Sequence, residues 1–461
     1  MQVPQELTTG YAVPATSTTI ASLFEKKGQD LTLADILDIA LGNSTITRAA
    51  WFQAQGAAAN VGSARSLFFP TINAGADYSR NEYSIVGTAI KTLYTTYGMN
   101  GSLNYILFNF GGRVSQADEA KYNMIAANLG QNTAIQNVIL QTESVYYQYL
   151  AAKALLAAEE ASHREAQEAL DAAQARHDSG VSTIADVLQA KTAFSQAQLA
   201  LDNTKGQLET IRGGLAATMG LPANVHFSVA DILPESIPVE KISGTVDTLI
   251  KEAEASRPDL AAARAQVKSS EYHIHSVWAQ GLPSFTLNGS ASRTYLYGIP
   301  GNPYYDSYSA AVLLQVPLFS GFSTAYNVFA AKSSERAARE QAESMRQSVI
   351  LEVWNSYYNL RTATQAVKTS EDLLTSAQQS EDVALARYRA GVGSIIDLLT
   401  AQSALASARA QEIQARAGWF IAMAQLAHDT GTLEPGSPGL NEPIIKSSIG
   451  KKNGGNDTNG K

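Results

Sequence analysis

Apolar residues along the chain follow two different periods. Over residues 113–179 and 322–390, neither of which contains proline, they recur three and four positions apart, as at Val145, Tyr149, Ala152 and Leu156. Alanine, glutamine, glutamate and leucine, which are good helix formers, are abundant in both segments. Each segment therefore predicts one helix of about 65 residues, which would span about 100 Å.

A glycine follows each of these long helical patterns. After Gly180 and Gly391 the helical period resumes, over residues 186–218 and 397–427. Glycine is the residue that most readily ends a helix and reverses the chain. The pattern thus predicts two long helical hairpins, with turns at Gly180 and Gly391.

Four other segments alternate strictly between apolar and polar residues. In the first, Ile72, Ala74, Ala76 and Tyr78 alternate with polar residues or glycine, and similar alternation occurs over residues 97–107, 285–292 and 308–316. Segments of about ten residues with this period are typical of membrane β-barrel strands. Ten of the 20 tyrosines lie in residues 69–110 and 283–320, where the aromatic girdles of such a barrel would need them. The alternative is a soluble two-hairpin sheet with its aromatic residues in a core.

The chain contains an internal repeat. The spacing between matching residues is 211 over more than 80 residues, and one inserted residue would rotate a helix face by about 100°, so this constancy indicates long helices packed in register. Upstream, the spacing slips by about two, as in the match of Phe110-Gly-Gly112 with Phe319-Ser-Gly321. The matches at 211 include Val138-Ile139-Leu140 with Val349-Ile350-Leu351, Tyr146-Tyr147 with Tyr357-Tyr358, Gly180 with Gly391, and Asp186 with Asp397.

These patterns divide the chain into five parts. We expect an N-terminal extended arm (1–30), a first repeat (31–220), an equatorial linker (221–246), a second repeat (247–431), and an equatorial segment with a disordered tail (432–461). The expected strands are at about 70–85 and 95–110 in the first repeat, and at about 283–297 and 305–319 in the second.

Composition excludes several kinds of chemistry. The 461 residues include no cysteine, which excludes disulfides, thiolate metal sites and a cysteine nucleophile. The net charge of −8 argues against a nucleic-acid partner. No run of about 18 apolar residues predicts a transmembrane helix, although alternating barrel strands would escape that test. No catalytic triad, phosphate-binding loop or metal-ligand spacing occurs, so we expect neither an enzyme nor a cofactor.

Four strands are too few to close a barrel by themselves. The smallest single-chain membrane barrels use about eight strands. Three copies of this chain would supply twelve, enough to leave a lumen rather than a packed interior. If the strands form a barrel, the chain must be a homo-oligomer, and a homotrimer is favoured.

An ordered set of motifs extends from residue 31 to about 435. It consists of Leu31-Thr-Leu-Ala-Asp35, Thr47-Arg-Ala-Ala-Trp51, Phe69-Pro70, Leu107-Phe-Asn-Phe-Gly-Gly112, Arg257-Pro-Asp-Leu260, Pro317-Leu-Phe-Ser-Gly321, Tyr388-Arg-Ala-Gly-Val392 and Asp397-Leu-Leu399. With these residues the chain resembles the outer-membrane efflux protein family. The resemblance implies an α+β membrane protein, in which a trimeric 12-stranded outer-membrane β-barrel continues into a long periplasmic α-helical barrel.

The resemblance also implies a function and partners. The protein would be a passive duct in the outer membrane of a Gram-negative bacterium, in contact with outer-membrane lipid. A periplasmic adaptor protein would open its tip, an inner-membrane transporter would supply energy, and drugs or other small molecules would leave through it. The alternatives are a duct for type I protein secretion, a flagellin-like secreted filament, and a soluble coiled-coil adaptor, which would need only one hairpin.

The family's gate lies at the hairpin turns. The resemblance places Asp397 in a constriction ring, where three like charges would attract cations, and Asp186 is its counterpart in the first repeat. Both carboxylates could instead simply complement a helix dipole. Some relatives have a second acidic residue one turn further on, where this chain has Thr400. Ile396 is the candidate for an apolar constriction, against ordinary helix packing.

Other turn residues match family positions with different roles. Tyr388 matches an aromatic residue that ties neighbouring hairpins in the closed state. The family's tip arginine corresponds to Gly393, so Arg389 is the candidate to replace it. The turn pairs Gly180-Val181 and Gly391-Val392 are the expected contacts for the adaptor, besides forming turns that any helix reversal requires.

Overall fold

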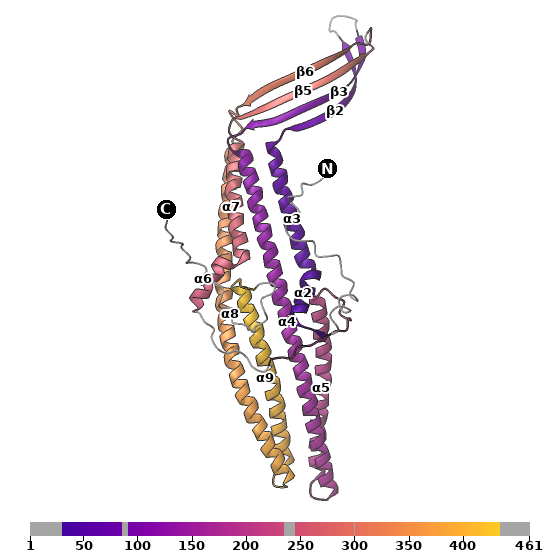
Figure 1. Cartoon of the computed structure of the whole chain (residues 1–461), viewed down its shortest axis with the longest axis vertical. Helices are drawn as coiled ribbons and strands as arrows, with labels where there is room; N and C mark the ends of the chain where they lie inside the picture. The colour runs from indigo at the N-terminus through magenta and orange to yellow at the C-terminus, as the bar shows by residue number, and fades with distance from the viewer. Residues whose placement is uncertain (1–29, 85–90, 235–244, 299, 434–461) are drawn as a thin grey trace, which may run out of the picture. The chain divides into compact units, whose positions relative to one another are not determined.

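The computed structural model describes residues 30–84, 91–234, 245–298 and 300–433 (Figure 1). The expected N-terminal arm up to residue 29, part of the expected linker (235–244) and the tail from 434 lie outside the described residues. In the first repeat the elements are α2 (Leu33–Asn43), α3 (Thr45–Arg65), the 3-10 turn η2 (Ser66–Phe68), β2 (Thr71–Ser84), β3 (Lys91–Phe108), α4 (Gly112–Asp178) and α5 (Ile184–Thr218). In the second they are α6 (Val246–Ser256), α7 (Pro258–Ala279), β5 (Ser284–Tyr297), β6 (Tyr304–Gln315), α8 (Ser323–Arg389) and α9 (Ile395–Asp429).

The long helices of the two repeats have equal lengths. Both α4 and α8 have 67 residues, and both α5 and α9 have 35. The predicted long helices over 113–179 and 322–390 are thereby confirmed. Helices α2 and α6 also match, with 11 residues each, but their starts differ by 213 positions (33 and 246), whereas those of α4 and α8 differ by 211 (112 and 323). The two-residue difference therefore arises in the strand-bearing segment.

The turns that lead into α4 and α8 correct one sequence match. Phe110 and Gly111 have φ values of 50° and 84°, and Gly321 and Phe322 have 61° and 66°, so these pairs are equivalent. The match of Phe110 with Phe319 was wrong by two residues. The repeat preserves two residues of left-handed backbone before each long helix. The phenylalanine is the first of the two in the first repeat and the second of the two in the second repeat.

The chain forms two compact units, each of which takes segments from both repeats. The first unit comprises Ala50–Gln131 and Pro258–Gln347 and contains an antiparallel sheet in the order β2-β3-β5-β6. The hairpin of each repeat thus pairs with the other through β3 and β5. Within this chain β2 pairs only with β3, and β6 only with β5, so the described structure leaves one edge of each outer strand unpaired.

The register gives the sheet two different faces. On one face lie the apolar residues of all four alternating segments, including a complete row formed by Tyr78, Tyr97, Tyr295 and Tyr304. That face is uncovered in this chain, since Met99 and Tyr308 are 75% and 76% exposed. The other face carries amide and hydroxyl groups, which bond across strands at Asn104–Asn288, Ser290–Ser309 and Ser79–Thr96.

Arg113 holds the start of α4 against the sheet. Its Nη1 donates to the Leu67 carbonyl at 3.3 Å and its Nη2 to the Leu107 carbonyl at 3.0 Å, while the guanidinium lies 5.2 Å from the centre of the Phe68 ring. Helix α7 packs against α4 in the same unit, where Tyr122 and Tyr272 stack at 5.4 Å.

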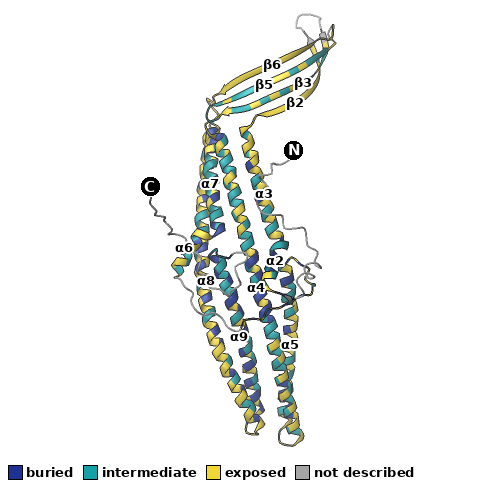
Figure 2. Ribbon diagram, in the orientation of Figure 1, coloured by how far each residue is buried: buried dark blue, intermediate teal, exposed yellow. Residues whose placement is uncertain are grey.

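The second unit contains the larger core and both helical hairpins. The described part of this unit comprises residues 30–49, 132–234, 245–257 and 348–433. A short parallel pair, β1 (Asp30–Leu31) with β4 (Ser228–Val229), closes one side of a core that includes Ile36, Leu150, Leu215 and Met219. Figure 2 shows buried residues concentrated along α9 and the facing part of α4. None of the described helices has both the length and the apolar character needed to cross a bilayer.

Candidate functional site at the hairpin turns

The two hairpin turns have the same backbone. Gly180 and Gly391 have φ values of 76° and 77°, in the left-handed region that favours glycine. The next residue closes each helix end, because the Val181 amide donates to the Arg176 carbonyl at 2.9 Å and the Val392 amide to the Arg387 carbonyl at 3.0 Å.

The two turn valines project from the protein. Val181 and Val392 are 64% and 70% exposed in this chain. Each turn thus presents an apolar side chain at the end of its hairpin.

Asp186 and Asp397 lie in the first turns of α5 and α9. A carboxylate oxygen of Asp186 accepts the Thr183 amide at 3.2 Å, so Asp186 serves in part as a cap of its helix. At the second turn the Ser394 hydroxyl performs the capping, accepting the Asp397 amide at 3.1 Å. The Asp397 side chain is exposed and, within the described residues, makes no ion pair. Ile396 beside it is 56% exposed, so it is not packed into the helical core.

Tyr388 joins the second hairpin to the first. Its ring is 4% exposed, the Arg176 guanidinium lies 4.9 Å from the ring centre, and Arg176 Nη1 donates to the Tyr388 carbonyl at 2.8 Å. Burial raises the pKa of the Tyr388 hydroxyl, Arg176 opposes that rise, and Asp186 reinforces it. Arg176 and Asp186 of the first hairpin therefore both lie close to Tyr388 of the second.

Arg389, the candidate replacement for the family's tip arginine, makes only a weak contact. Its Nη2 is 3.9 Å from a Glu168 carboxylate oxygen, and the side chains are 67% and 74% exposed. Solvent-exposed pairs of this kind contribute about 0–1 kcal/mol. The structure instead gives Arg176 the role of joining the hairpins.

A second charged contact joins the hairpins further from the turns. Arg409 on α9 binds both carboxylate oxygens of Glu165 on α4, at 2.9 and 3.1 Å. Glu381 on α8 is buried nearby, and burial raises the pKa of its carboxyl. A bidentate, largely buried arginine–carboxylate pair constrains geometry more than an exposed one does.

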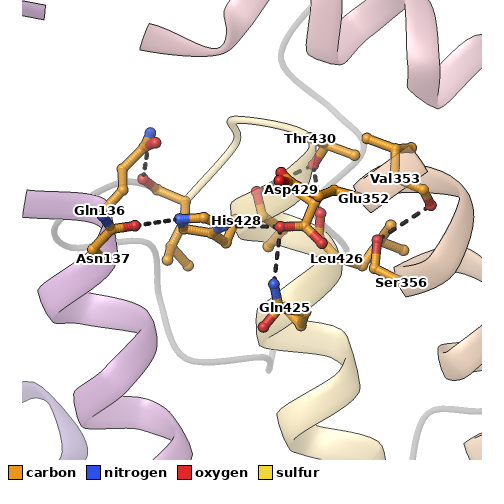
Figure 3. A network of polar contacts seen from close by, with 12 residues as sticks. Gln136, Asn137, Glu352, Val353, Ser356, Gln425, Leu426, His428, Asp429 and Thr430 are labelled. Carbon is orange, nitrogen blue, oxygen red and sulfur yellow. Dashed lines mark hydrogen bonds and ion pairs between the residues drawn. The ribbon is translucent and has the colours of Figure 1, made fainter. Parts of the chain in front are cut away.

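A polar network joins the far end of α9 to both long helices (Figure 3). His428 lies within hydrogen-bond distance of Asp429 (2.9 Å) and of Asn137 on α4 (2.8 Å), and the Gln425 amide donates to Asp429 at 2.9 Å. Arg257, which begins the Arg-Pro-Asp-Leu motif, is 6% exposed and pairs with Glu352 on α8 while also reaching the Asp429 carbonyl. That motif therefore connects the α6–α7 break to α8 and α9.

Sequence reasoning missed Arg176 and Arg409. The repeat offered a signal for Arg409, since the position 211 residues earlier is Gln198, so the charge is specific to the second repeat. No such signal existed for Arg176, because its counterpart is also arginine, Arg387.

Among the described residues no cluster of acidic or histidine side chains could hold a metal ion. The chemistry of the site is therefore that of contacts between helices, with an exposed carboxylate at one turn.

Known proteins share this combination of a four-stranded sheet and two long helical hairpins. The family model "Outer membrane efflux protein" matches residues 36–221 and 249–432. Protein CyaE of Bordetella pertussis is 25% identical over 394 residues, covering 83% of this chain and 80% of that protein. The pyoverdine export outer membrane protein OpmQ of Pseudomonas putida is 26% identical over 395 residues, covering 82% and 81%. The solved structure of the outer-membrane channel OprN superposes with a TM-score of 0.76 at 19% identity, covering 91% of this chain and 94% of that one.

The chain belongs to the outer membrane efflux protein family, since the two matched segments cover most of its length. The resemblance found in the sequence is thereby confirmed, and the localisation is the outer membrane. The fold is that of an outer-membrane channel with mixed helix and sheet. Family membership sets aside the flagellin-like filament and the soluble adaptor.

Proposed function

We propose that this protein is the passive outer-membrane exit duct of a tripartite efflux system and acts as a homotrimer. The observation that carries the proposal is the two-faced, four-stranded sheet with unpaired outer edges at β2 and β6. An exposed sheet edge pairs readily with another strand. Three copies joined β6 to β2 close a ring of twelve strands, with the apolar face towards lipid and the amide and hydroxyl face towards a lumen.

The long hairpins then form the periplasmic part of the duct. A chain with 67-residue helices that lack an apolar span is suited to an aqueous helical barrel below the membrane. A periplasmic adaptor binds the exposed turns at Val181 and Val392, and an inner-membrane transporter supplies the energy. The duct itself performs no catalysis.

The gate lies at the turns. Three Asp397 carboxylates, one from each copy, form an acidic ring, and Ile396 adds an apolar rim next to it. Both side chains are exposed in one chain, as residues that face a pore must be. Asp186, which caps its own helix, contributes less to the ring. The cargo is a small organic molecule, since one relative is named for pyoverdine export.

Planar-bilayer recordings test the duct and its gate together. We expect purified wild-type protein to insert, with a small, cation-selective conductance, and Asp397→Asn to increase that conductance and weaken the selectivity. Equal conductance in the two would retain the duct but discard Asp397 as the gate, in favour of Ile396. Protein that stays soluble without detergent and never inserts would refute the duct.

A further inference from the structure

An ion pair lies on the apolar face of the sheet. One row of this face, called here the tyrosine row, consists of Tyr78, Tyr97, Tyr295 and Tyr304. From the tyrosine row to the strand ends that lead to the helices, the described strands place only two charged residues on this face, Arg293 of β5 and Asp306 of β6. In the duct proposed above this face meets lipid, where ionisable side chains are costly and mark functional sites.

The pair has the geometry of a specific contact. Arg293 Nε donates to Asp306 Oδ1 at 2.7 Å, and Nη2 donates to Oδ2 at 2.9 Å. The guanidinium also lies 5.1 Å from the centre of the Tyr304 ring in the adjacent row. The arginine and aspartate side chains remain 51% and 30% exposed, so the pair is open to molecules that touch this face. A bidentate pair fixes both groups and presents a donor and an acceptor side by side.

Both members of the pair can bind more than each other. The two hydrogen bonds use only part of the donor set of the Arg293 guanidinium and part of the acceptor positions of the Asp306 carboxylate. The other N–H groups of an arginine suit a phosphate oxygen, and the other lone pairs of a carboxylate suit a hydroxyl donor. The chemistry of the pair therefore fits a ligand that carries both phosphate and hydroxyl groups.

Exposed aromatic rings frame the ion pair. Tyr304 and Tyr308, two positions before and after Asp306 on the same face, are 59% and 76% exposed. In the tyrosine row, Tyr97 and Tyr295 stack with 5.2 Å between ring centres and 11° between ring planes. A tyrosine ring combines an apolar body with a polar hydroxyl, and such side chains are enriched where a membrane changes from apolar to wet. The surroundings of the pair thus suit a headgroup rather than an acyl chain.

The position of the pair along the strands also matches a headgroup. Aromatic rows mark the two interfaces of a membrane barrel. Arg293 lies two residues nearer to the helices than Tyr295, which is about 5 Å deeper for a tilted strand. The tyrosine row lies towards the hairpin ends of the strands, so in the proposed duct it belongs to the outer leaflet. An arginine at this depth is within reach of phosphate groups in that leaflet.

Resting on the orientation of the duct proposed above, we propose that Arg293 and Asp306 bind the headgroup of a phosphorylated glycolipid of the outer leaflet. Arg293 donates to a phosphate oxygen, Asp306 accepts sugar hydroxyl groups, and the rings of Tyr304 and Tyr308 cover the sugar. A headgroup with a phosphate but no sugar satisfies the arginine and leaves the carboxylate beside an anion. A phosphorylated sugar complements both members of the pair, so the site prefers it to a simple phospholipid.

Native mass spectrometry of delipidated protein in a mild detergent tests the site. Titration of the wild type with bis-phosphorylated lipid A should add one lipid for each copy of the chain. The double variant Arg293→Gln/Asp306→Asn leaves an uncharged amide pair and no unpaired charge, and its affinity for lipid A should fall at least about tenfold. Arg80→Gln is the matched control, because it removes the same charge from the same face beyond the tyrosine row. Its affinity should change less than about twofold.

Two further lipids identify the headgroup. Dephosphorylated lipid A lacks the phosphate, and phosphatidylglycerol lacks the sugar. Each should bind the wild type at least about fivefold more weakly than bis-phosphorylated lipid A does. Equal affinity for phosphatidylglycerol would overturn the assignment to a glycolipid, and equal affinity for dephosphorylated lipid A would overturn the phosphate contact of Arg293.

The outcomes separate this proposal from the duct on which it rests. A wild-type trimer that inserts into liposomes but binds lipid A no better than the double variant overturns the lipid site and leaves the duct intact. A monomer that does not insert overturns both. An equal loss of affinity in Arg80→Gln and in the double variant would show a general attraction between charges, and it would overturn the site.

A single substitution keeps the test decisive should the double variant fail to assemble. Asp306→Asn retains the arginine and its phosphate contact but weakens the acceptor for the sugar. The preference of the protein for lipid A over phosphatidylglycerol should then fall at least about threefold. An unchanged preference would overturn the role of Asp306 and, with it, the site.

Discussion

The two helical hairpins share a backbone but differ in their surroundings. The turn glycines have φ values of 76° and 77°, and the helices on either side have equal lengths. Yet the residue three positions before the turn glycine is a partly exposed histidine in one hairpin, His177, and a buried tyrosine in the other, Tyr388. The shared residues determine the hairpin itself, and the differing ones determine what each hairpin packs against.

The same contrast occurs at the two helix breaks that precede α3 and α7. Ser44 separates α2 from α3 and accepts the Thr47 amide at 3.2 Å, whereas Arg257 separates α6 from α7 and reaches α8 and the end of α9. Both residues are buried, at 8% and 6% exposure. The first repeat thus uses a local cap where the second uses a long-range ion pair.

Replacing Arg257 should have the largest effect on stability. Arg257→Met keeps much of the alkyl packing but removes the ion pair and the bond to the Asp429 carbonyl, which we expect to cost about 3 kcal/mol. The thermal midpoint of the helical circular dichroism, measured in detergent, should fall by several degrees. Ser44→Ala removes only a cap, at about 1 kcal/mol. Equal shifts for the two variants would contradict the contrast between the breaks.

Replacing Glu143 should have an effect of similar size, which develops only as the pH rises above about 4.5. It occupies the position equivalent to Trp354, and burial raises the pKa of its carboxyl to about 7. Because the folded pKa lies above the unfolded value of 4.5, its ionisation lowers the stability of the fold as pH rises from about 4.5 to about 7. Glu143→Gln removes this penalty, so it should stabilise the protein by about 3 kcal/mol at pH 8 and by much less at pH 5.

Thermal melts at the two pH values measure this difference. The control is Glu160→Gln, which changes an exposed carboxylate on the same helix. Its effect should be small at both pH values. A gain for Glu143→Gln that is the same at pH 5 and pH 8 would show that Glu143 is already charged in the folded protein at low pH.

Sequence alone could predict the parts of this fold that depend on period. The spacing of apolar residues predicts the long helices α4 and α8 almost to the residue, because the segments contain no proline and a glycine follows each of them. The shorter helices α2, α3, α6 and α7 were not predicted, because a helical period over only 11 to 22 residues is hard to tell from the neighbouring segments. The alternation in the strands becomes a two-faced sheet only through the register, which depends on which strands pair.

The site was predicted less completely than the fold. The resemblance directs attention to Tyr388 and Asp397, but the partner of Tyr388 lies 212 residues away in sequence, at Arg176. Arg389 is adjacent to Tyr388 and looked more suitable, yet its helical position points it towards solvent and Glu168. Contacts between two hairpins depend on helix rotation, which a motif does not report.

Arg176→Gln should open the tip, with a smaller energetic effect than the two changes above. It removes a charged hydrogen bond and a cation–π contact between the two hairpins of each chain, together about 1–2 kcal/mol. We expect the closed-state conductance in planar bilayers to increase. Arg389→Gln breaks only an exposed 3.9 Å pair and should leave conductance unchanged. The reverse order of effects would return the family arginine's role to Arg389.

The smallest effect should be the same in both hairpins. Gly180→Ala and Gly391→Ala force a side chain into left-handed backbone, at a cost of about 1 kcal/mol each, since no atom lies within 4 Å of either added Cβ to change that figure. Gly206→Ala is the matched control, because Gly206 lies within helix α5 with equally open space, and alanine there should stabilise by about 0.5–1 kcal/mol. Thermal melts in detergent should give equal losses at the two turns and a gain at position 206. A larger loss of stability for Gly391→Ala than for Gly180→Ala would mean that the left-handed backbone matters more to the fold at the second turn than at the first. The difference between the hairpins would then extend from their side chains to their backbone.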